Sequence, residues 1–519
     1  MADSVDAIVV GAGHNGLVAA LLLARAGLKV RVLEDKGVVG GAARTEHPFK
    51  KAPNLGMSTG AYLLGLMPPE LIQKLGVEMP VVRRDPHYFL PTEGKRYLLF
   101  GSNAAQTKEQ FVSFFSEADW RANVAMHEEI AQIREDVAPT FLQEPLTIEE
   151  TAEKYIRPQL RQVFVDLCRK PVNEYLERFQ FKSDLVKAMY AVTDGFSGLT
   201  GSWGTPGTGM NFLIHNMCRL PGADGTWMIV RGGMGTVTGR LAEAARKHGA
   251  RIDVNAGVSK LILEGGVAKG VVLHDGTEIR AEVVVCNADP FRMRQLVGRE
   301  ALPGDYNTRL DEYGKKTGTT MKVNLALRGL PKFTCLPEDR GQYGATIHLL
   351  PSEDRVIESL RTGFADVQQG KLPEFPTIEW YIHTTVDPSL QDADGNHNSA
   401  LFVQWVPREL RGTTWEAEES RYVAHLLSIC DRFAPGTSDL VVDTFPLHPQ
   451  KIEQHFGITH GHIHHVDNSF GFADRLPYVT PIAGLYSCSA GCHPAGSVIG
   501  AAGHNAAMRV LGDLGRAAQ

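Results

Sequence analysis

Three glycines near the N-terminus have the spacing of a dinucleotide-binding turn. Gly11, Gly13 and Gly16 follow the apolar run DAIVV and open an alanine-rich segment typical of a helix. The first glycine permits a tight turn, the second lets the backbone approach a pyrophosphate, and the third lets the helix lie close to the strand. The helix N-terminus would offer N–H donors and a positive dipole to the phosphates. Glu34 ends a second apolar strand, where a carboxylate accepts hydrogen bonds from a ribose.

A second glycine pair follows that strand and extends the predicted site. Gly40 and Gly41 leave room for a pyrophosphate to pass, and Arg44 could hold a phosphate or the flavin side through charge-assisted hydrogen bonds. Nicotinamide enzymes have no need of this extension, so the segment favours FAD over NAD. The alternative is ordinary Gly-Gly turn chemistry without a ligand.

The C-terminal segment 481–515 has the composition of a helix pressed against a flat ligand. We expect a short strand over 482–488, a loop that contains Gly491, and a helix over 497–511 that is rich in glycine and alanine around Gly500. Small residues let the N-terminus of this helix approach a flavin, and its dipole favours negative charge on the reduced ring. We therefore include Gly491 and Gly500 among the candidate cofactor-binding residues.

These segments resemble the phytoene desaturase-related FAD-dependent oxidoreductases, and most closely the branch of pyridine nucleotide-disulfide oxidoreductase domain 2 proteins. Carotenoid desaturases, carotenoid isomerases and retinol saturases are more distant members. The resemblance implies bound FAD but leaves the substrate open, because relatives of this fold desaturate, saturate, isomerise or oxidise amines. It covers nearly the whole chain and is carried by GAGHNGLVAA, GGAART, TDGFSGLTGSWGTPGTG, RGGMGTVTGRLAEAARKHGARI, HDGTEIRAEVVVCNADP and GLYSCSAGCHPAGSVIGAAGHNAA.

The resemblance also implies roles for single residues. The backbone of Val258 would contact the adenine, and His465 would lie in a strand that faces the flavin and the substrate, as a candidate acid or base. His493 is the second catalytic candidate. Relatives typically continue HPGGG where this chain has HPAGS. Ala495 and Ser497 would therefore narrow the space at the flavin edge or make it more polar.

The function implied is FAD-dependent hydride transfer between flavin N5 and an apolar substrate, unsaturated or isoprenoid-like. Loss of hydride from carbon leaves cation character, which a nearby histidine or carboxylate would quench. Three alternatives stay open: a redox-neutral isomerase or hydratase that uses reduced FAD, an amine oxidase, and an FAD-stabilised interaction protein without turnover. An amine oxidase should have an aromatic cage beside the flavin, for which the candidates are Trp203, Tyr381, Trp405 and Tyr486.

Length and pattern predict an α/β protein in which two domains are interleaved. We expect a Rossmann-type FAD-binding domain interleaved with an α+β substrate-binding domain of the amine oxidase and phytoene desaturase type. Thr193, Asp194 and His215 match the substrate domain of the relatives and could line its cavity, although helix caps and a surface histidine explain them equally well. The FAD-binding domain would comprise 1–60, 225–300 and 475–519, and the substrate-binding domain 61–224 and 301–474.

Composition excludes several classes of protein. Hydrophobic residues make up 43% of the 519 residues, charged residues 22%, and the net charge is −6, which is typical of a globular protein without a nucleic-acid-binding surface. The first strand begins at residue 6 and no eighteen-residue apolar run occurs, so we expect no signal peptide, no membrane span and a cytoplasmic location. A hydrophobic small-molecule substrate leaves open a peripheral contact with a membrane.

The cysteines and clustered histidines are the remaining candidates for chemistry. Seven scattered cysteines favour reduced thiols. Cys488 and Cys492, with three residues between them, fit two buried side chains better than a redox pair or a flavin tether. In an extended segment, His460, His462 and His464 would share one face and could gather around a metal. No carboxylate at clear spacing supports this, and we predict no metal site.

Overall fold

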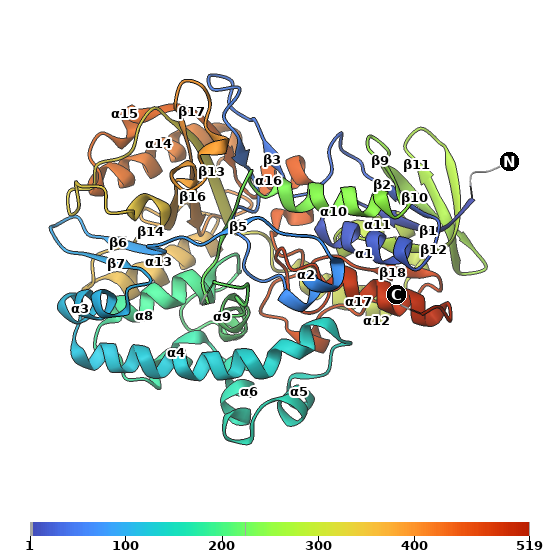
Figure 1. Ribbon diagram of the computed structural model, residues 1–519, viewed down its shortest axis with the longest axis horizontal. Helices are drawn as coiled ribbons and strands as arrows, with labels where there is room; N and C mark the ends of the chain where they lie inside the picture. The colour runs from blue at the N-terminus through green and yellow to red at the C-terminus, as the bar shows by residue number, and fades with distance from the viewer. Residues whose placement is uncertain (1–3, 224, 518–519) are drawn as a thin grey trace.

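The computed structural model describes residues 4–223 and 225–517 and contains two seven-stranded β-sheets (Figure 1). The sheet at the right of Figure 1 brings together segments that lie far apart in the sequence: blue β1 and β2, green β9 to β12, and red β18. The second sheet lies at the upper left, and a layer of helices that includes α4 lies below it. The chain therefore crosses between the two sheets several times.

The first sheet has the strand order β10-β11-β12-β1-β2-β9, and β18 pairs with β12. Pairing is parallel from β9 through β2 and β1 to β12 and on to β18, whereas β10, β11 and β12 form an antiparallel meander. Its strands are β1 (Ser4–Val10), β2 (Val30–Leu33), β9 (Arg251–Asp253), β10 (Val258–Glu264), β11 (Val267–Leu273), β12 (Glu278–Cys286) and β18 (Leu485–Ser487).

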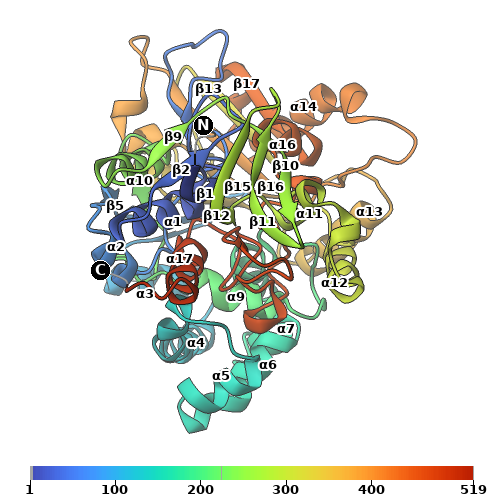
Figure 2. The same cartoon turned by 90° about the vertical axis from the view of Figure 1, so that its right-hand side faces the viewer.

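Helix α1 (His14–Arg25) connects β1 to the parallel strand β2 and completes a βαβ unit. It contacts α10 (Gly235–Lys247) and α17 (Ala501–Asp513), and Figure 2 shows these three helices on one side of the first sheet. Leu17 and Leu21 are fully buried, as is typical of a helix that is apolar on all sides and packed within a core. The position of α1 therefore fixes the β1–α1 turn at the carboxyl ends of the parallel strands.

The second sheet has the order β17-β13-β16-β15-β14-β6-β7 and is antiparallel except for the β14–β6 pair. Met321 and Val323 of β13 pack into an apolar core with helix α14 (Trp415–Phe433), while Lys322 between them points to the opposite face. The strands are β6 (Tyr88–Pro91), β7 (Tyr97–Phe100), β13 (Thr320–Leu327), β14 (Thr346–Leu349), β15 (Thr377–Tyr381), β16 (His397–Gln404) and β17 (Val441–Leu447).

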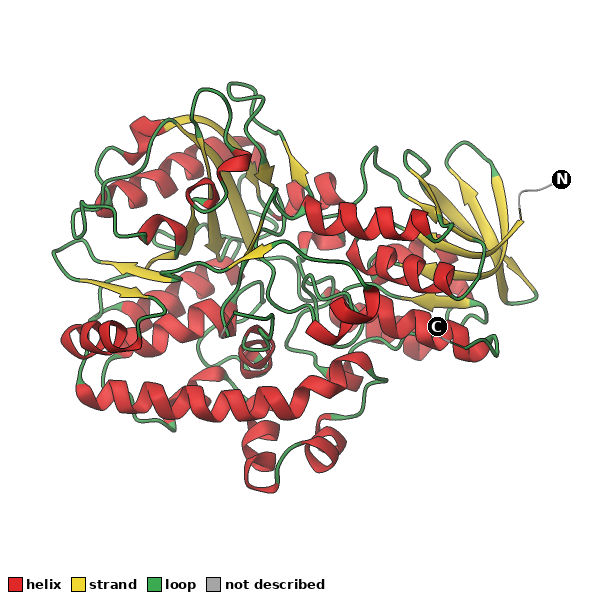
Figure 3. Ribbon diagram, in the orientation of Figure 1, coloured by secondary structure: helices red, strands yellow, loops and turns green. Residues whose placement is uncertain are grey.

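Helices and two small sheets surround these layers (Figure 3). The small sheets pair β3 (Thr45–Glu46) with β4 (Met57–Ser58) and β5 (Val81–Val82) with β8 (Ile229–Val230). No helix in residues 4–223 and 225–517 combines the length and apolar composition that a membrane crossing requires. The other α-helices are α2 (Pro69–Leu75), α3 (Ala104–Phe114), α4 (Glu117–Val137), α5 (Ile148–Tyr155), α6 (Arg161–Arg169), α7 (Val172–Glu177), α8 (Asp184–Tyr190), α9 (Thr208–His215), α11 (Pro290–Val297), α12 (Gly304–Gly314), α13 (Val356–Gln368), α15 (Thr437–Leu440) and α16 (Pro449–Phe456).

The predicted α/β fold with a Rossmann-type βαβ unit is confirmed, while two local predictions are wrong. The C-terminal helix begins at Ala501 rather than at residue 497, after Gly500 in a left-handed conformation (φ +79°). The histidine-rich segment is a series of turns and not an extended strand, with positive φ at His460 and His465. The exact domain boundaries stay predictions from the sequence.

Candidate functional site

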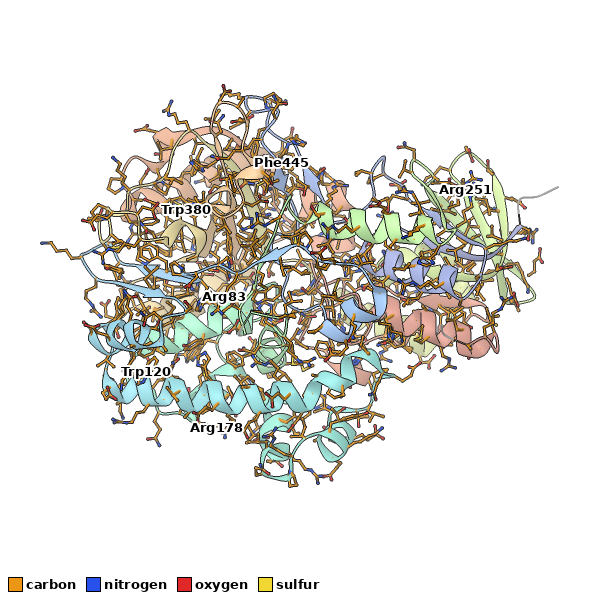
Figure 4. The ribbon with its side chains drawn as sticks, viewed as in Figure 1. Arg83, Trp120, Arg178, Arg251, Trp380 and Phe445 are labelled. Atoms are coloured by element: carbon orange, nitrogen blue, oxygen red, sulfur yellow. The ribbon has the colours of Figure 1, made fainter. Side chains whose placement is uncertain are left out.

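One cavity of about 1210 Å³ runs from the first sheet to the second. Its wall includes the β1–α1 turn, the loops after β2, one side of α4, and the inner face of the second sheet. Figure 4 labels two of its wall residues, Arg83 and Trp120. We call the two parts of this cavity the glycine end, lined by Gly11, Gly13, Gly40 and Gly41, and the charged end, lined by Arg84, Asp194, Lys322 and Glu379.

The β1–α1 turn admits backbone where side chains would not fit. A Cβ added to Gly16 would lie 2.3 Å from the carbonyl oxygen of Gly11, and one added to Gly13 would lie 2.8 Å from Nδ2 of Asn287. Gly11 and Gly13 line the cavity, whereas Gly16 lies beneath the turn. No side chain caps α1 at Gly13, so the first-turn N–H groups are left for a phosphate.

Glu34 lies at the carboxyl end of β2 with its carboxylate turned toward the glycine turn. Its two oxygens accept hydrogen bonds from the backbone N–H groups of Ala12 at 2.7 Å and of Lys36 at 2.9 Å. Both Glu34 and Val258, at the start of β10, line the glycine end. A carboxylate held in this way can accept hydrogen bonds from ribose hydroxyls, as the sequence predicts.

The segment after β2 crosses close to the glycine turn. Gly41 has φ of +58°, and a Cβ there would lie 3.4 Å from the backbone of that turn. Gly40 and Arg44 also line the cavity. Nη2 of Arg44 lies 2.8 Å from Nε2 of His455 and 3.1 Å from Oε1 of Glu46, while its buried Nε has no hydrogen-bond partner among the described residues. A buried donor without a partner is the feature expected of a site that binds an anion.

At the C-terminal segment the predicted glycines lie just behind the cavity wall. Ala490, Ser497 and Val498 line the cavity, but Gly491 and Gly500 are not among the lining residues. A Cβ on Gly491 would lie 3.2 Å from Cδ of Pro290, and Gly500 caps the N-terminus of α17. These two glycines therefore shape the segment that contacts the cavity without facing it themselves.

His465 lies in the cavity wall, in a tight turn rather than in a strand. Its φ is +61°, and its N–H donates to the carbonyl of His462 at 2.8 Å. The buried Arg475 holds the residues that follow: Nη2 donates to the carbonyls of Val466 at 3.1 Å and Ala490 at 2.8 Å. Because one guanidinium binds both segments, the histidine turn is fixed relative to the C-terminal wall of the cavity.

Two neutral imidazoles face the cavity beside the glycine turn. Burial lowers the pKa of His465 to about 4, although the charge of Asp289 opposes this, and burial together with the nearby His465 lowers the pKa of His14 to about 4. Nδ1 of His465 and Nε2 of His14 are buried, and neither has a hydrogen-bond partner within the described chain. Both side chains can therefore accept a proton or a hydrogen bond from a ligand.

His493 lies behind the wall, away from the cavity. It is fully buried, its Nε2 lies 2.8 Å from the carbonyl oxygen of Thr140, and its ring packs 5.5 Å from that of Phe472. It does not belong to the residues that line the cavity. The structure thus brings His465 to the site together with the glycine turn, but not His493.

The charged end is the polar face of the second sheet. Along β15, Ile378 and Trp380 pack into the apolar core, while Glu379 and Tyr381 line the cavity. On β13, Nζ of the buried Lys322 donates to the carbonyls of Ser58 and, at 2.9 Å, of Gly60. Burial holds the pKa of Lys322 well below its usual range and raises that of Glu379 to about 7.

A π-helical turn places a second carboxyl group in this wall. Residues Ala191–Phe196 form a π-helix, in which Thr193 and Asp194 face the cavity. Burial, and then the charge of Glu379, raise the pKa of Asp194 to about 7. Nδ1 of His215 lies 3.9 Å from Oδ1 of Asp194. Thr193, Asp194 and His215, which the sequence suggested for a substrate cavity, therefore line this cavity.

Several sequence candidates lie elsewhere. Of the four aromatic residues considered for a cage, only Tyr381 lines the cavity; Trp203, Trp405 and Tyr486 do not. Trp405 is buried and donates to the carbonyl of Gly201 at 3.0 Å. The seven cysteines are free and buried. Within the described residues, no group of three or more His, Cys, Asp or Glu is arranged to hold a metal ion.

Comparisons with known proteins agree with this geometry. The family model for flavin containing amine oxidoreductase matches residues 16–347. The pyridine nucleotide-disulfide oxidoreductase domain-containing protein 2 of Rattus norvegicus is 33% identical over 98% of this chain and 94% of its own. Hydroxyneurosporene desaturase of Cereibacter sphaeroides is 24% identical over 98% and 97% of the two chains. Wild-type putrescine oxidase bound to putrescine superposes with a TM-score of 0.57 and 15% identity, covering 98% of this chain and 99% of its own.

The chain belongs to the flavin-containing amine oxidoreductase family, and its cofactor is FAD. Within that family it is similar over nearly its whole length to the domain 2 proteins and, more distantly, to carotenoid desaturases, so the predicted resemblance is confirmed. The residues present fit FAD: glycines leave space at the turn, a carboxylate stands at the end of β2, and Arg44 keeps an unpartnered buried N–H.

Three residues of the charged end were missed by reasoning from the sequence. Lys322 and Glu379 did leave a signal, because each interrupts a strand at a position that alternates with buried apolar residues. Arg84 left none, since it lies in the run VVRRDP, which reads as an exposed turn.

Proposed function

We propose that this oxidoreductase takes a hydride from a carbon atom of a substrate that has both an apolar body and a polar group. The observation that carries the proposal is the single cavity, which joins the glycine end to the polar face of the second sheet. When bound, FAD accepts the hydride at its N5 atom. The protein's own task is to bind the substrate, orient it and exclude water.

In this proposal the glycine end holds the cofactor. Glu34 and Val258 would hold the adenosine, and the α1 N-terminus with Arg44 would hold the diphosphate. Ala490 and Ser497 would contact the ring system from the C-terminal segment.

His465 is our candidate for the catalytic base. Its imidazole is buried, neutral and unpartnered at Nδ1, so it can accept the proton that the substrate loses with the hydride, or stabilise developing cation character. The charge of the nearby His465 helps to lower the pKa of His14, and His14 is a candidate partner for the catalytic base. The turn that carries His465 is held by Arg475, which supports a fixed orientation.

The charged end narrows the substrate expected from the sequence. A pure hydrocarbon would supply no counter-ion to the buried Arg84 and would place only carbon against the carboxyls of Glu379 and Asp194, which is unfavourable. A desaturase substrate that also carries a polar group would satisfy them. We therefore propose an amphipathic substrate in place of the purely hydrophobic one expected from the sequence.

An amine substrate is the second candidate. The ring of Tyr62 lies 4.6 Å from that of Tyr381 and 5.9 Å from that of Phe402, and the carboxyls of Glu379 and Asp194 could receive an ammonium group. The likeness to putrescine oxidase supports this candidate. The buried cation Arg84 weighs against it.

The proposal is tested by anaerobic mixing of FAD-loaded protein with unsaturated organic acids, isoprenoid hydrocarbons and amines, while the visible absorbance of the flavin is followed. We expect amphipathic unsaturated compounds to bleach the flavin. Bleaching by amines alone would favour the second candidate. Conversion of a substrate without net flavin reduction would favour an isomerase or hydratase, and retention of FAD without any response would favour a non-catalytic protein.

A further inference from the structure

Arg84 is a buried cation in the cavity wall that forms no ion pair. Its side chain is only 3% exposed. Nε donates to the carbonyl of Trp227 at 3.0 Å and Nη1 to Oγ1 of Thr346 at 2.7 Å. Within the described chain, no carboxylate approaches the guanidinium closely enough to pair with it, and no hydrogen bond engages Nη2.

Such an arrangement is costly unless a ligand completes it. A guanidinium stays charged at any physiological pH, and a buried charge without a counter-ion is strongly unfavourable. Glu379 is the carboxyl group whose charge acts on Arg84, but it accepts a hydrogen bond from the hydroxyl of Tyr381 instead of pairing with the guanidinium. Arg84 is thus hydrogen-bonded to neutral groups and has no paired counter-ion among the described residues.

The surroundings of Arg84 offer a further donor. Tyr381 lies on β15, which pairs with the strand β14 that carries Thr346, and the ring of Tyr62 lies 4.6 Å from that of Tyr381 in the wall of the same cavity. The hydroxyl of Tyr381 donates to Glu379, so the hydroxyl of Tyr62 is the candidate donor. Thr346 fixes the guanidinium from β14. A planar fork with a hydroxyl group beside it matches the geometry of a carboxylate.

We propose that Arg84, with the hydroxyl of Tyr62, binds a carboxylate group of the substrate, so that the substrate is an amphipathic organic acid. This rests on the proposed function for the reaction itself, but the binding site can be tested without turnover. A carboxylate is favoured over a phosphate group because a dianion would also meet the nearby carboxyls of Glu379 and Asp194.

The test uses FAD-loaded protein and four probes with one carbon chain: octanoate, octanamide, octylamine and octylphosphonate. Binding is followed by the change in the visible flavin spectrum and by the shift in Tm. We expect octanoate to bind about 10- to 100-fold more tightly than the amide or the amine. Equal binding of octanoate and octanamide, stronger binding of octylamine, or no response to octanoate would overturn the proposal, and stronger binding of octylphosphonate would overturn the choice of a carboxylate.

Variants assign the preference to one residue. Arg84→Gln should remove the preference for octanoate, while Arg84→Lys, which keeps the charge, should retain part of it and serves if the first variant does not fold. Arg134→Gln is the matched control, because it removes a half-buried cation from the same wall. An equal loss in Arg134→Gln would mean that general positive potential attracts the probe, and the assignment to Arg84 would be wrong. If octanoate binds but no compound reduces the flavin, the carboxylate site is supported and the proposed reaction is refuted.

Discussion

The two ends of the cavity are built in different ways. The glycine end is made mostly of backbone from two neighbouring segments, 11–16 and 34–44, joined by local turns. The charged end is made of side chains from β13, β15, the π-helix and the loop before β6, which are spread along the chain from residue 84 to residue 381. The first arrangement suits a cofactor whose shape is constant, and the second suits a substrate that differs between relatives.

The largest expected effect is at the glycine end. We expect Gly16→Ala to abolish FAD retention, at a cost of at least about 3 kcal/mol, because the new Cβ would lie 2.3 Å from the carbonyl oxygen of Gly11. Flavin content after gel filtration measures the effect. Gly239→Ala in α10, where a Cβ meets no atom within 4 Å, is the control and should be neutral or slightly stabilising. Normal flavin content in Gly16→Ala would contradict the tight turn.

The next effect is catalytic and lies between the two ends. His465→Ala should leave FAD content and folding intact and slow flavin reduction by roughly 10²- to 10⁴-fold, since a positioned base is lost. His493→Ala should instead lower Tm with a smaller change in rate, because that side chain is buried outside the cavity. Rapid-mixing measurements with a reducing substrate compare the two. Equal rates in wild type and His465→Ala would exclude the proposed role.

A smaller effect probes the ribose contact. Glu34→Ala should weaken FAD binding by about 1 to 3 kcal/mol, because a charge-assisted hydrogen bond is lost and the N–H of Ala12 loses its partner. Glu34→Gln keeps a hydrogen-bond acceptor, so its affinity for FAD should lie between those of the wild type and of Glu34→Ala. Equilibrium dialysis measures both. FAD affinity that is unchanged in Glu34→Ala would show that the carboxylate serves the turn alone.

The smallest effect is a pH dependence at the charged end. Octanoate affinity should fall a few-fold as pH rises through about 7, the pKa to which burial raises Glu379 and Asp194, because both carboxyls then become negative near Arg84. Tyr62, Tyr88 and Tyr381, which also surround Glu379, stay neutral in this range because burial raises their pKa further. Spectral titration at several pH values tests this. Glu379→Gln should flatten the profile, and a rise in affinity with pH would contradict the account.

Most of the glycine end could be predicted from the sequence, because its conformation depends on residues close together in the chain. A turn that needs positive φ and close backbone approach leaves glycines at set spacings, as at Gly11 and Gly41, and an acidic residue ends the next strand. The position of His465 followed from the family resemblance, but its turn conformation did not, because tertiary hydrogen bonds from Arg475 determine it.

The charged end could not be predicted in the same way. Arg84 becomes buried only because β5, β8 and β14 converge on it, and no local pattern encodes such long-range packing. For Asp194 the sequence left a cavity residue and an ordinary helix cap equally open, and the π-helical turn places it in the cavity wall. Of the two tryptophans considered for an aromatic cage, Trp405 is a core residue and the partly buried Trp203 packs against the same core.

The most direct test of the central claim is anaerobic flavin reduction by a small-molecule cell extract that has been separated on an anion exchanger at neutral pH. The claim is that FAD at the glycine end oxidises an acidic, amphipathic substrate held at the charged end. We predict that the retained, acidic fraction bleaches the flavin and that both Arg84→Gln and His465→Ala slow the bleaching. Bleaching confined to the unretained neutral or cationic compounds would contradict the account.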